Sequence, residues 1–268
     1  MHTSVHPAQQ ATPSPTFHAH IDPVTAVEFF VDPACMWSWW TWRWLASVAP
    51  IRAFDVRIRP YSLFLRETSK QQPALDGWKR PVWQASLRAV RVLQALDATG
   101  DTDGAKRLWT ELIQDGAAAF ADQRPQFTDP ATVLGTAGLP AELAAAADDP
   151  ALDEDILAGM AEMNAVIGTG VGTPALILCG GAEPVGVHGP MLGSAVDLPE
   201  ALHIWEAVAL FARSPALLEL SRSRPQRPPM YPIAIHRCIR SDLGCGLSRG
   251  HRTAAGGRRP AAVLHTDR

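Results

Sequence analysis

A single cysteine at the start of an expected helix is the feature that most constrains this chain. Cys35 follows a short apolar run at 26–31 and a turn at 32–34, and a tryptophan-rich stretch at 37–45 comes after it. The apolar run is typical of a buried strand, and the tryptophan-rich stretch can continue as a helix. The first turn of a helix offers unpaired N–H groups and a partial positive charge, which favour a thiolate over a thiol. The segment therefore predicts a strand, a tight turn and a reactive thiol.

The position three residues after this cysteine holds Ser38, where a second cysteine would complete a redox pair. A mixed disulfide at Cys35 would persist until an external thiol attacks it, because no neighbouring sulfur can displace it. We expect a monothiol cycle, in which Cys35 attacks a disulfide or an oxidised substrate and a low-mass thiol regenerates it. Ser38 lies about one helical turn away, so its hydroxyl can donate a hydrogen bond to the thiolate and keep the thiol pKa low.

Strand and helix patterns divide the chain into an α/β part and an all-helical part. Short apolar runs predict four strands, at 25–31, 54–61, 175–179 and 183–188, the last two joined by a Gly-Gly turn that suits a hairpin. We expect a helix from Cys35 to about Val48, because Pro50 cannot continue it. From about 66 to 165 strand-like runs are absent, and apolar residues recur at helical spacing. With an amphipathic helix at about 199–212, the order predicts an α/β domain interrupted by a helical insertion.

Length and composition are typical of a soluble globular protein. The chain has 268 residues, of which 47% are hydrophobic and 19% are charged. No apolar run in the sequence is long enough to span a membrane. The N-terminal residues lack the basic and apolar regions of a secretory signal, so we expect a cytoplasmic protein. Four scattered cysteines do not suggest a disulfide framework in that compartment.

Charge is distributed unevenly along the chain. The segment 222–268 carries a formal charge of +8, whereas 1–221 carries −11. The basic tail has little periodicity, so we expect it to be disordered, and no aromatic interleaving supports a specific nucleic-acid site. The cysteines and histidines of the tail do not have the usual zinc spacing, so we expect no metal.

Three stretches of the sequence resemble a known family. They are Phe30-Val31-Asp32-Pro33-Ala34-Cys35-Met36-Trp37-Ser38-Trp39, Ala137-Gly138-Leu139-Pro140-Ala141-Glu142-Leu143 and Val171-Gly172-Thr173-Pro174. Over about residues 25–221 the chain resembles DsbA-like proteins of the thioredoxin fold, and within them the mycothiol-dependent nitroreductases. That family usually has Pro and Cys where this chain has Met36 and Ser38.

The resemblance implies a fold and a domain organisation. The fold class is α/β, a thioredoxin-like domain with an inserted all-helical domain. The implied segments are a thioredoxin-like domain at 25–66 plus 166–221 and a helical insertion at 67–165. Outside the resemblance, composition predicts a flexible leader at 1–24 and the basic tail at 222–268.

The resemblance also implies the residues of the site. Cys35 would be the nucleophilic thiol, with Ser38 as a second catalytic residue. A cis peptide bond at Thr173–Pro174 would face the sulfur and accept the backbone of a substrate or cofactor. The remaining implied binding residues are Met36, Trp37 and Gly172. The implied co-substrate is a low-mass thiol, mycothiol, and the implied substrates are small or protein disulfides or small electrophilic and nitroaromatic compounds.

Tryptophans surround the cysteine motif. Trp40 and Trp44 lie four residues apart, so we expect that face of the helix to pack on the sheet. Trp37 lies inside the motif, and we expect it to form a flat apolar wall for an aromatic substrate or the thiol cofactor. Trp78 and Trp83, at the start of the insertion, either form the opposite wall or belong to the core.

Two other functions remain open alongside a thiol oxidoreductase. Kappa-class glutathione transferases and chromene carboxylate isomerases resemble the chain in outline, but they tend to have Ser in the place of Cys35. A non-catalytic binding module, with or without a degenerate thiol site, would use the acidic, tryptophan-lined cleft alone. Replacing Cys35 by Ser separates the three, since the oxidoreductase loses all turnover, the transferase retains some and the binding module is indifferent.

Overall fold

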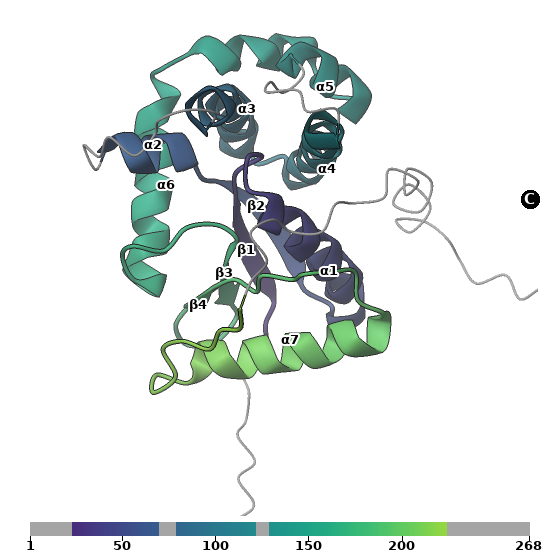
Figure 1. Ribbon diagram of the computed structural model, residues 1–268, viewed down its shortest axis with the longest axis vertical. Coiled ribbons are helices and arrows are strands. Elements are labelled where there is room, and N and C mark those ends of the chain that lie inside the picture. The colour runs from purple at the N-terminus through teal and green to yellow at the C-terminus, as the bar shows by residue number, and fades with distance from the viewer. Residues whose placement is uncertain (1–22, 70–78, 122–128, 224–268) are drawn as a thin grey trace, which may run out of the picture. The chain divides into compact units, whose positions relative to one another are not determined.

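A computed structural model describes residues 23–69, 79–121 and 129–223 of the chain (Figure 1). Its strands are β1 (Ala26–Val31), β2 (Asp55–Pro60), β3 (Ala175–Cys179) and β4 (Val185–His188). Its helices are α1 (Met36–Arg52), α2 (Leu63–Ser69), α3 (Lys79–Ala98), α4 (Thr102–Ala121), α5 (Pro130–Ala137), the 3₁₀ helix η1 (Ala141–Asp148), α6 (Leu152–Ile167) and α7 (Leu198–Arg213). All of them belong to one compact unit within Met1–Met230. The leader and almost all of the basic tail lie outside the described residues.

The described strands form one mixed sheet in the order β2-β1-β3-β4. β1 is parallel to β2 and antiparallel to β3, and β3 is antiparallel to β4. A parallel pair needs a crossover connection, and α1 provides it between β1 and β2. The predicted strands and the hairpin between β3 and β4 are confirmed, with strand bounds that differ from the predicted ones by two residues at most.

Successive side chains of β1 point to opposite faces of the sheet and so contact two sets of helices. Phe29 is fully buried and stacks on Trp42 of α1 at a ring-centroid distance of 6.2 Å. Trp109 of α4 meets the same ring edge-on at 6.3 Å. Phe30 belongs instead to a cluster that contains Met163 of α6. Helices therefore cover both faces of the sheet (Figure 1). The helices α4 and α6, which pack on opposite faces, both lie between β2 and β3 in the chain.

The element order and the sheet together identify the fold. A strand, a helix and a parallel strand are followed by the helices α2 to α6, and then by an antiparallel hairpin and a last helix. This is a thioredoxin-like α/β domain with an inserted helical part, so the predicted fold class is confirmed. The boundaries of the insertion at 67–165 stay a prediction.

Tryptophans join α1 to α7. Trp44 is 2% exposed, donates from Nε1 to the carbonyl of Ala201 at 2.9 Å, and lies 6.1 Å from the ring of Trp205. Trp40 and Trp44 are both buried, as expected, but Trp44 packs on α7. Trp42 of α1 contacts the sheet instead, through Phe29. Helical periodicity identifies a buried face without saying which element covers it.

The predicted end of α1 near Val48 is wrong, since the helix continues through Pro50 to Arg52. A proline removes one helical N–H donor, and here it lies in the last turn, where few further hydrogen bonds depend on it. The helix ends at Ala53, which adopts a left-handed conformation with φ of 55° and donates its N–H to the carbonyl of Ala49.

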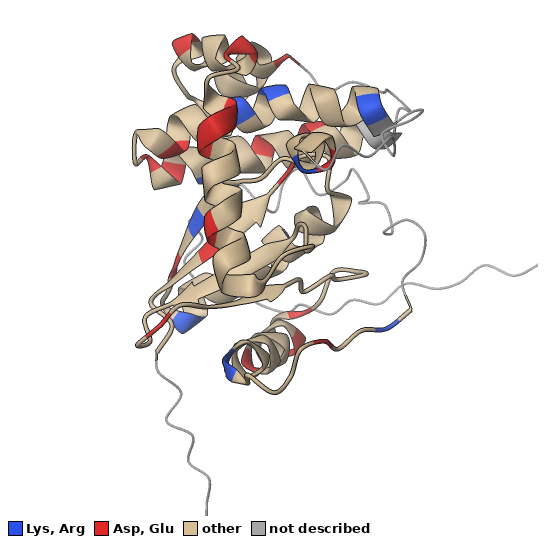
Figure 2. Ribbon diagram, turned by 90° about the vertical axis from the view of Figure 1, so that its left-hand side faces the viewer, with Lys and Arg blue, Asp and Glu red and all other residues tan. Residues whose placement is uncertain are grey.

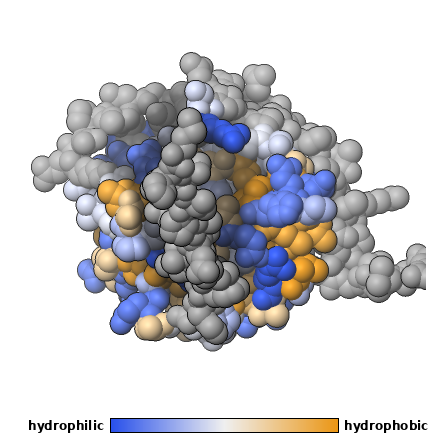
Figure 3. All heavy atoms as spheres, turned by 90° about the horizontal axis from the view of Figure 1, so that it is seen from below, coloured by the Kyte–Doolittle hydropathy of each residue, from blue (hydrophilic) through white to orange (hydrophobic). Residues whose placement is uncertain are grey.

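Charged and apolar side chains are mixed on the surface. Figure 2 shows acidic residues spread over the helices, with basic residues between them. From the side on which α7 lies, hydrophilic and hydrophobic residues both reach the surface (Figure 3). Leu198 and Leu210 of α7 are among the exposed apolar side chains. Over the described ranges, none of the helices has both the length and the apolar character of a membrane span.

We predict that Trp44→Ala lowers the free energy of unfolding by about 3–5 kcal/mol, because it removes a fully buried indole and leaves a cavity between α1 and α7. Leu210→Ala is the matched control, since Leu210 is 58% exposed on α7, and should change stability by about 0.5 kcal/mol or less. Urea unfolding followed by circular dichroism measures both, and equal effects would contradict the proposed role of Trp44.

Candidate active site

The turn between β1 and α1 places Cys35 at the N-terminus of α1. Cys35 is the N-cap residue, with φ of −88° and ψ of 95°. Its N–H donates to the carbonyl of Asp32 at 2.8 Å, and its carbonyl accepts from the N–H of Ser38 at 3.0 Å. The expected strand, turn and helix are present, and the Cys35 side chain makes no capping hydrogen bond to α1.

The Cys35 sulfur faces the loop that precedes β3. The thiol donates to the carbonyl of Thr173 at 3.2 Å, a contact between residues 138 positions apart. The Thr173–Pro174 peptide bond is cis, as the resemblance implied. The sheet brings the two segments together, because Phe30 near the end of β1 pairs with Ala175 at the start of β3.

Two buried hydroxyl groups lie beside this sulfur. Ser38 is fully buried and Thr173 is 6% exposed, and neither side-chain oxygen has a hydrogen-bond partner among the described residues. Both hydroxyls nevertheless lower the pKa of Cys35. The protonated thiol donates its hydrogen to a carbonyl, whereas a thiolate can only accept. Ser38 and Thr173 are therefore available as donors to the sulfur once its proton has left.

The prediction of a low thiol pKa is wrong for this state of the site. Burial of Cys35, which is 7% exposed, removes the water that would stabilise a thiolate, and so raises the pKa of Cys35 above its ordinary value. The side chains of Ser38 and Thr173 and the Ser38 N–H oppose this effect, and the Asp32 carboxylate adds to it. The resting sulfur is thus a thiol, and it must lose its proton before it can act as a nucleophile.

Asp32 is the residue of the site that the sequence analysis did not identify. It is fully buried. Its Oδ1 accepts from the Ala34 N–H at 2.8 Å and from the Ser86 hydroxyl of α3, and its Oδ2 accepts from the Leu63 N–H at 2.7 Å. One carboxylate thus joins the cysteine turn to α2 and α3. An Asp-Pro pair after a strand is an ordinary turn sequence, and the distant partners of Asp32 leave no local signal.

The pKa of Asp32 is raised to about 6. Burial raises it, whereas the hydrogen bonds from Ser86, Leu63 and Ala34 and the positive charge of Arg66 lower it. Near neutral pH most of the carboxyl is therefore ionised, and lowering the pH by about one unit protonates about half of it.

The implied binding residues of the motif lie at the first turn of α1. Met36 and Trp37 are half-buried, and Trp37 packs against the apolar cluster that contains Cys35. Trp83 of α3 packs against the same cluster, which makes it available as a second wall. Trp78 lies outside the described residues.

Gly172, the residue before Thr173, is buried against Arg66. A Cβ atom at position 172 would lie 2.5 Å from Nη1 of Arg66. The glycine therefore leaves the room that the guanidinium occupies beside the loop.

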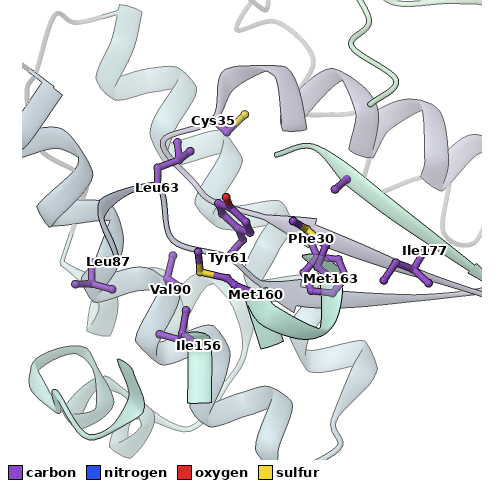
Figure 4. Packing of buried hydrophobic residues seen from close by; sticks show 11 residues of the cluster. Phe30, Cys35, Tyr61, Leu63, Leu87, Val90, Ile156, Met160, Met163 and Ile177 are labelled. Atoms are coloured by element: carbon purple, nitrogen blue, oxygen red, sulfur yellow. The ribbon is translucent and has the colours of Figure 1, made fainter. Parts of the chain in front are cut away.

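The apolar cluster extends from the cysteine into the core. Figure 4 shows Tyr61 in this cluster, with its hydroxyl directed toward the end at which Cys35 lies. That hydroxyl donates to the carbonyl of Val171 at 3.2 Å. Tyr61 thus links the sheet to the loop that faces the sulfur.

A second free cysteine lies in the described part of the chain. Cys179 is free and half-buried at the end of β3, and burial raises its pKa. No group of three or more His, Cys, Asp or Glu side chains within the described ranges could hold a metal ion. The cysteines and histidines of the basic tail lie outside those ranges.

The chain is similar to a known protein family and to a solved structure. The model of the Rv2466c-like family, described as Mycothiol-dependent nitroreductase Rv2466c, matches residues 34–222 and so covers more than half of the chain. Among solved structures, a candidate protein disulfide isomerase from Nitrosomonas europaea is similar with a TM-score of 0.44 and 15% sequence identity. That match covers 70% of this chain and 98% of the other.

We predict that Asp32→Asn removes a pH dependence of stability. The pKa of Asp32 is about 6 in the folded protein and near 3.8 for an ordinary carboxyl, so protonation favours the folded state. The stability that this group contributes is present below about pH 4 and is lost as the pH rises through about 6. The wild type should lose about 2.4 kcal/mol relative to the variant between about pH 4 and pH 7.5. Urea unfolding at both pH values measures this, and a difference between the two proteins that does not change with pH would contradict it.

Proposed function

The chain belongs to the Rv2466c-like family of mycothiol-dependent nitroreductases, and from this membership we propose that it works by a monothiol mechanism through Cys35. The observation that carries the proposal is the position of the thiol. Cys35 caps α1, its sulfur lies 3.2 Å from the carbonyl of Thr173, and Ser38 occupies the place of a second cysteine.

The residues around Cys35 suit a thiol co-substrate such as mycothiol, which supplies the reducing electrons. The unpartnered hydroxyls of Ser38 and Thr173 can donate to the sulfur in its anionic form. Loss of the Cys35 proton also frees the Thr173 carbonyl to accept a hydrogen bond from an amide of the thiol compound or the substrate. Both effects favour the form of the site that reacts.

With a disulfide substrate, the proposed cycle has two steps. Cys35 loses its proton, its sulfur attacks one sulfur of the substrate, and the other half of the substrate leaves as a thiolate. The deprotonated low-mass thiol then attacks the substrate sulfur now bonded to Cys35, which releases Cys35 as a thiolate. One disulfide and one thiol enter the cycle, and one disulfide and one thiol leave it, so sulfur–sulfur bonds and electrons balance.

With a nitroaromatic substrate, the same sulfur takes part in a two-electron reduction. A nitro group that becomes a nitroso group takes up two electrons and two protons and releases one water molecule. Oxidation of two thiols to one disulfide supplies both the electrons and the protons. In the proposed reaction one thiol is Cys35 and the other is mycothiol, and a second mycothiol then releases Cys35 as in the disulfide cycle.

Both proposed domains contribute residues to the site. The segments 25–66 and 166–221 supply Cys35 and the loop at Thr173–Pro174, and the insertion at 67–165 supplies Ser86 and Trp83 beside them. A monothiol cycle needs a supply of reduced low-mass thiol, which suits the cytoplasm.

The first experiment measures the intact mass of the reduced protein after incubation with oxidised mycothiol and then with excess mycothiol. We expect one adduct that forms in the first step and is released in the second. Cys35→Ser should abolish the adduct and all turnover, whereas Cys179→Ser, the matched control, should retain both. Turnover that survives in Cys35→Ser would favour a transferase of the kappa glutathione transferase type, and an adduct confined to other cysteines would overturn the proposal.

We also predict that Ser38→Cys converts the monothiol site into a dithiol site. The new sulfur lies three residues after Cys35 on the first turn of the same helix, so it can displace a thiol compound bound to Cys35. The adduct should then disappear without added thiol, and the protein should become about two mass units lighter than its reduced form, because an internal disulfide has lost two hydrogens. A stable adduct in Ser38→Cys would show that the two side chains cannot meet.

A further inference from the structure

A buried threonine of α1 joins the cysteine helix to the loop after β4, which comprises residues 189–197. Thr41 is fully buried, and its hydroxyl lies 2.7 Å from the carbonyl oxygen of Pro190 and 3.0 Å from that of Trp37. The contact with Trp37 lies within α1, where a threonine hydroxyl often bonds to the carbonyl four residues earlier. The contact with Pro190 is the shorter one and joins residues 149 positions apart. The Thr41 hydroxyl therefore fixes the loop after β4 to α1.

The same loop is bonded to the segment that faces the reactive sulfur. β3 and β4 are antiparallel, and Ala175 at the start of β3 pairs with His188 at the end of β4. The contact continues just beyond this pair, since the N–H of Gly189 donates to the carbonyl of Pro174 at 2.8 Å. Thr173, the residue before Pro174, accepts from the reactive thiol. Gly189 therefore holds the neighbour of the residue that meets the sulfur.

These contacts join three segments in a closed ring. α1 has Cys35 as its N-cap residue and carries Thr41 in its interior. The Thr173–Pro174 loop meets the sulfur, and the loop after β4 is bonded both to that loop and to α1. The pairing of β3 with β4 fixes the two loops relative to each other, and the Thr41 hydroxyl fixes the second loop to α1. The distance between the sulfur and the Thr173 carbonyl therefore depends in part on a hydrogen bond that lies away from both.

We propose that Thr41 is a positioning residue, which keeps the Thr173 carbonyl beside the Cys35 sulfur through the loop after β4. The inference rests on the proposed function, because it takes this carbonyl to accept a hydrogen bond from the thiol compound or the substrate. A reaction that uses such a hydrogen bond needs the carbonyl in place, and a small misplacement slows it strongly. Alkylation of the sulfur by a small electrophile has no such requirement.

Thr41→Val tests the inference, because it removes the hydroxyl and keeps the branched shape of the side chain. Cys35 of the full-length variant should react with oxidised mycothiol about tenfold more slowly than in the wild type, the effect of losing one buried hydrogen bond. The rate at which iodoacetamide alkylates the same sulfur should not fall. Peptide mass spectrometry at timed intervals measures both rates, and the alkylation rate of Cys179 in the same molecule should stay unchanged unless the whole fold has loosened.

Two further variants separate positioning from stability. Thr41→Ser restores the hydroxyl, so the rate with oxidised mycothiol should return close to that of the wild type. Thr110→Val is the matched control, since the hydroxyl of Thr110 donates to the carbonyl of Lys106 within α4 at 2.8 Å. It should leave both rates unchanged. If Thr41→Val does not fold, Thr41→Ala takes its place, because it removes the hydroxyl without placing a methyl group against the Pro190 carbonyl.

Hydrogen exchange gives a readout that needs no reaction at the sulfur. The N–H of Gly189 should exchange about tenfold faster in Thr41→Val than in the wild type, because its bond to Pro174 opens more often when the loop is no longer fixed to α1. Thr41→Ser and Thr110→Val should exchange at this position as slowly as the wild type.

Three outcomes would overturn the inference. They are equal slowing in Thr41→Val and Thr41→Ser, a fall of the iodoacetamide rate in parallel with the mycothiol rate, and unchanged exchange at Gly189 in Thr41→Val. Failure of the proposed function is distinguishable from these. A wild type that forms no Cys35 adduct with oxidised mycothiol would refute the monothiol mechanism, and the exchange rate of Gly189 would still decide whether Thr41 holds the loop.

Discussion

A buried carboxylate holds the segments of the candidate site together. Asp32 accepts hydrogen bonds from Ala34 in the cysteine turn, from Leu63 at the start of α2 and from Ser86 of α3. An ionised carboxylate without such donors would be costly to bury, and buried donors without an acceptor would be costly as well. One side chain therefore joins the turn that carries Cys35 to both α2 and α3.

The burial that fixes this geometry also determines the state of the sulfur. It raises the pKa of Cys35, and the thiol proton is held by the Thr173 carbonyl. The two hydroxyls beside the sulfur, those of Ser38 and Thr173, stay without partners. A site of this kind disfavours the thiolate at rest but offers hydrogen-bond donors to the thiolate once it forms. The proposed reactivity of Cys35 therefore depends on what removes the thiol proton.

Local patterns in the sequence predicted the strands, the hairpin and most helices, because alternation and helical spacing reflect burial on one face. They failed at Pro50, where the remaining turn of α1 forms in spite of the missing N–H. They also assigned Trp44 to the sheet, although it packs on α7. The role of Asp32 was not predicted, because the sequence around an exposed turn aspartate is the same as that around a buried one whose partners are distant in the chain.

A strand, a turn and a helix that present one cysteine with a serine three residues later could be predicted from the sequence, since these features depend on residues close together in the chain. The contact of the sulfur with Thr173, the contact of Arg66 with Gly172 and the raised thiol pKa became apparent in the folded chain. These features depend on the pairing of β1 with β3 and on the exclusion of water by distant helices. Neither leaves a signal in the residues next to the cysteine.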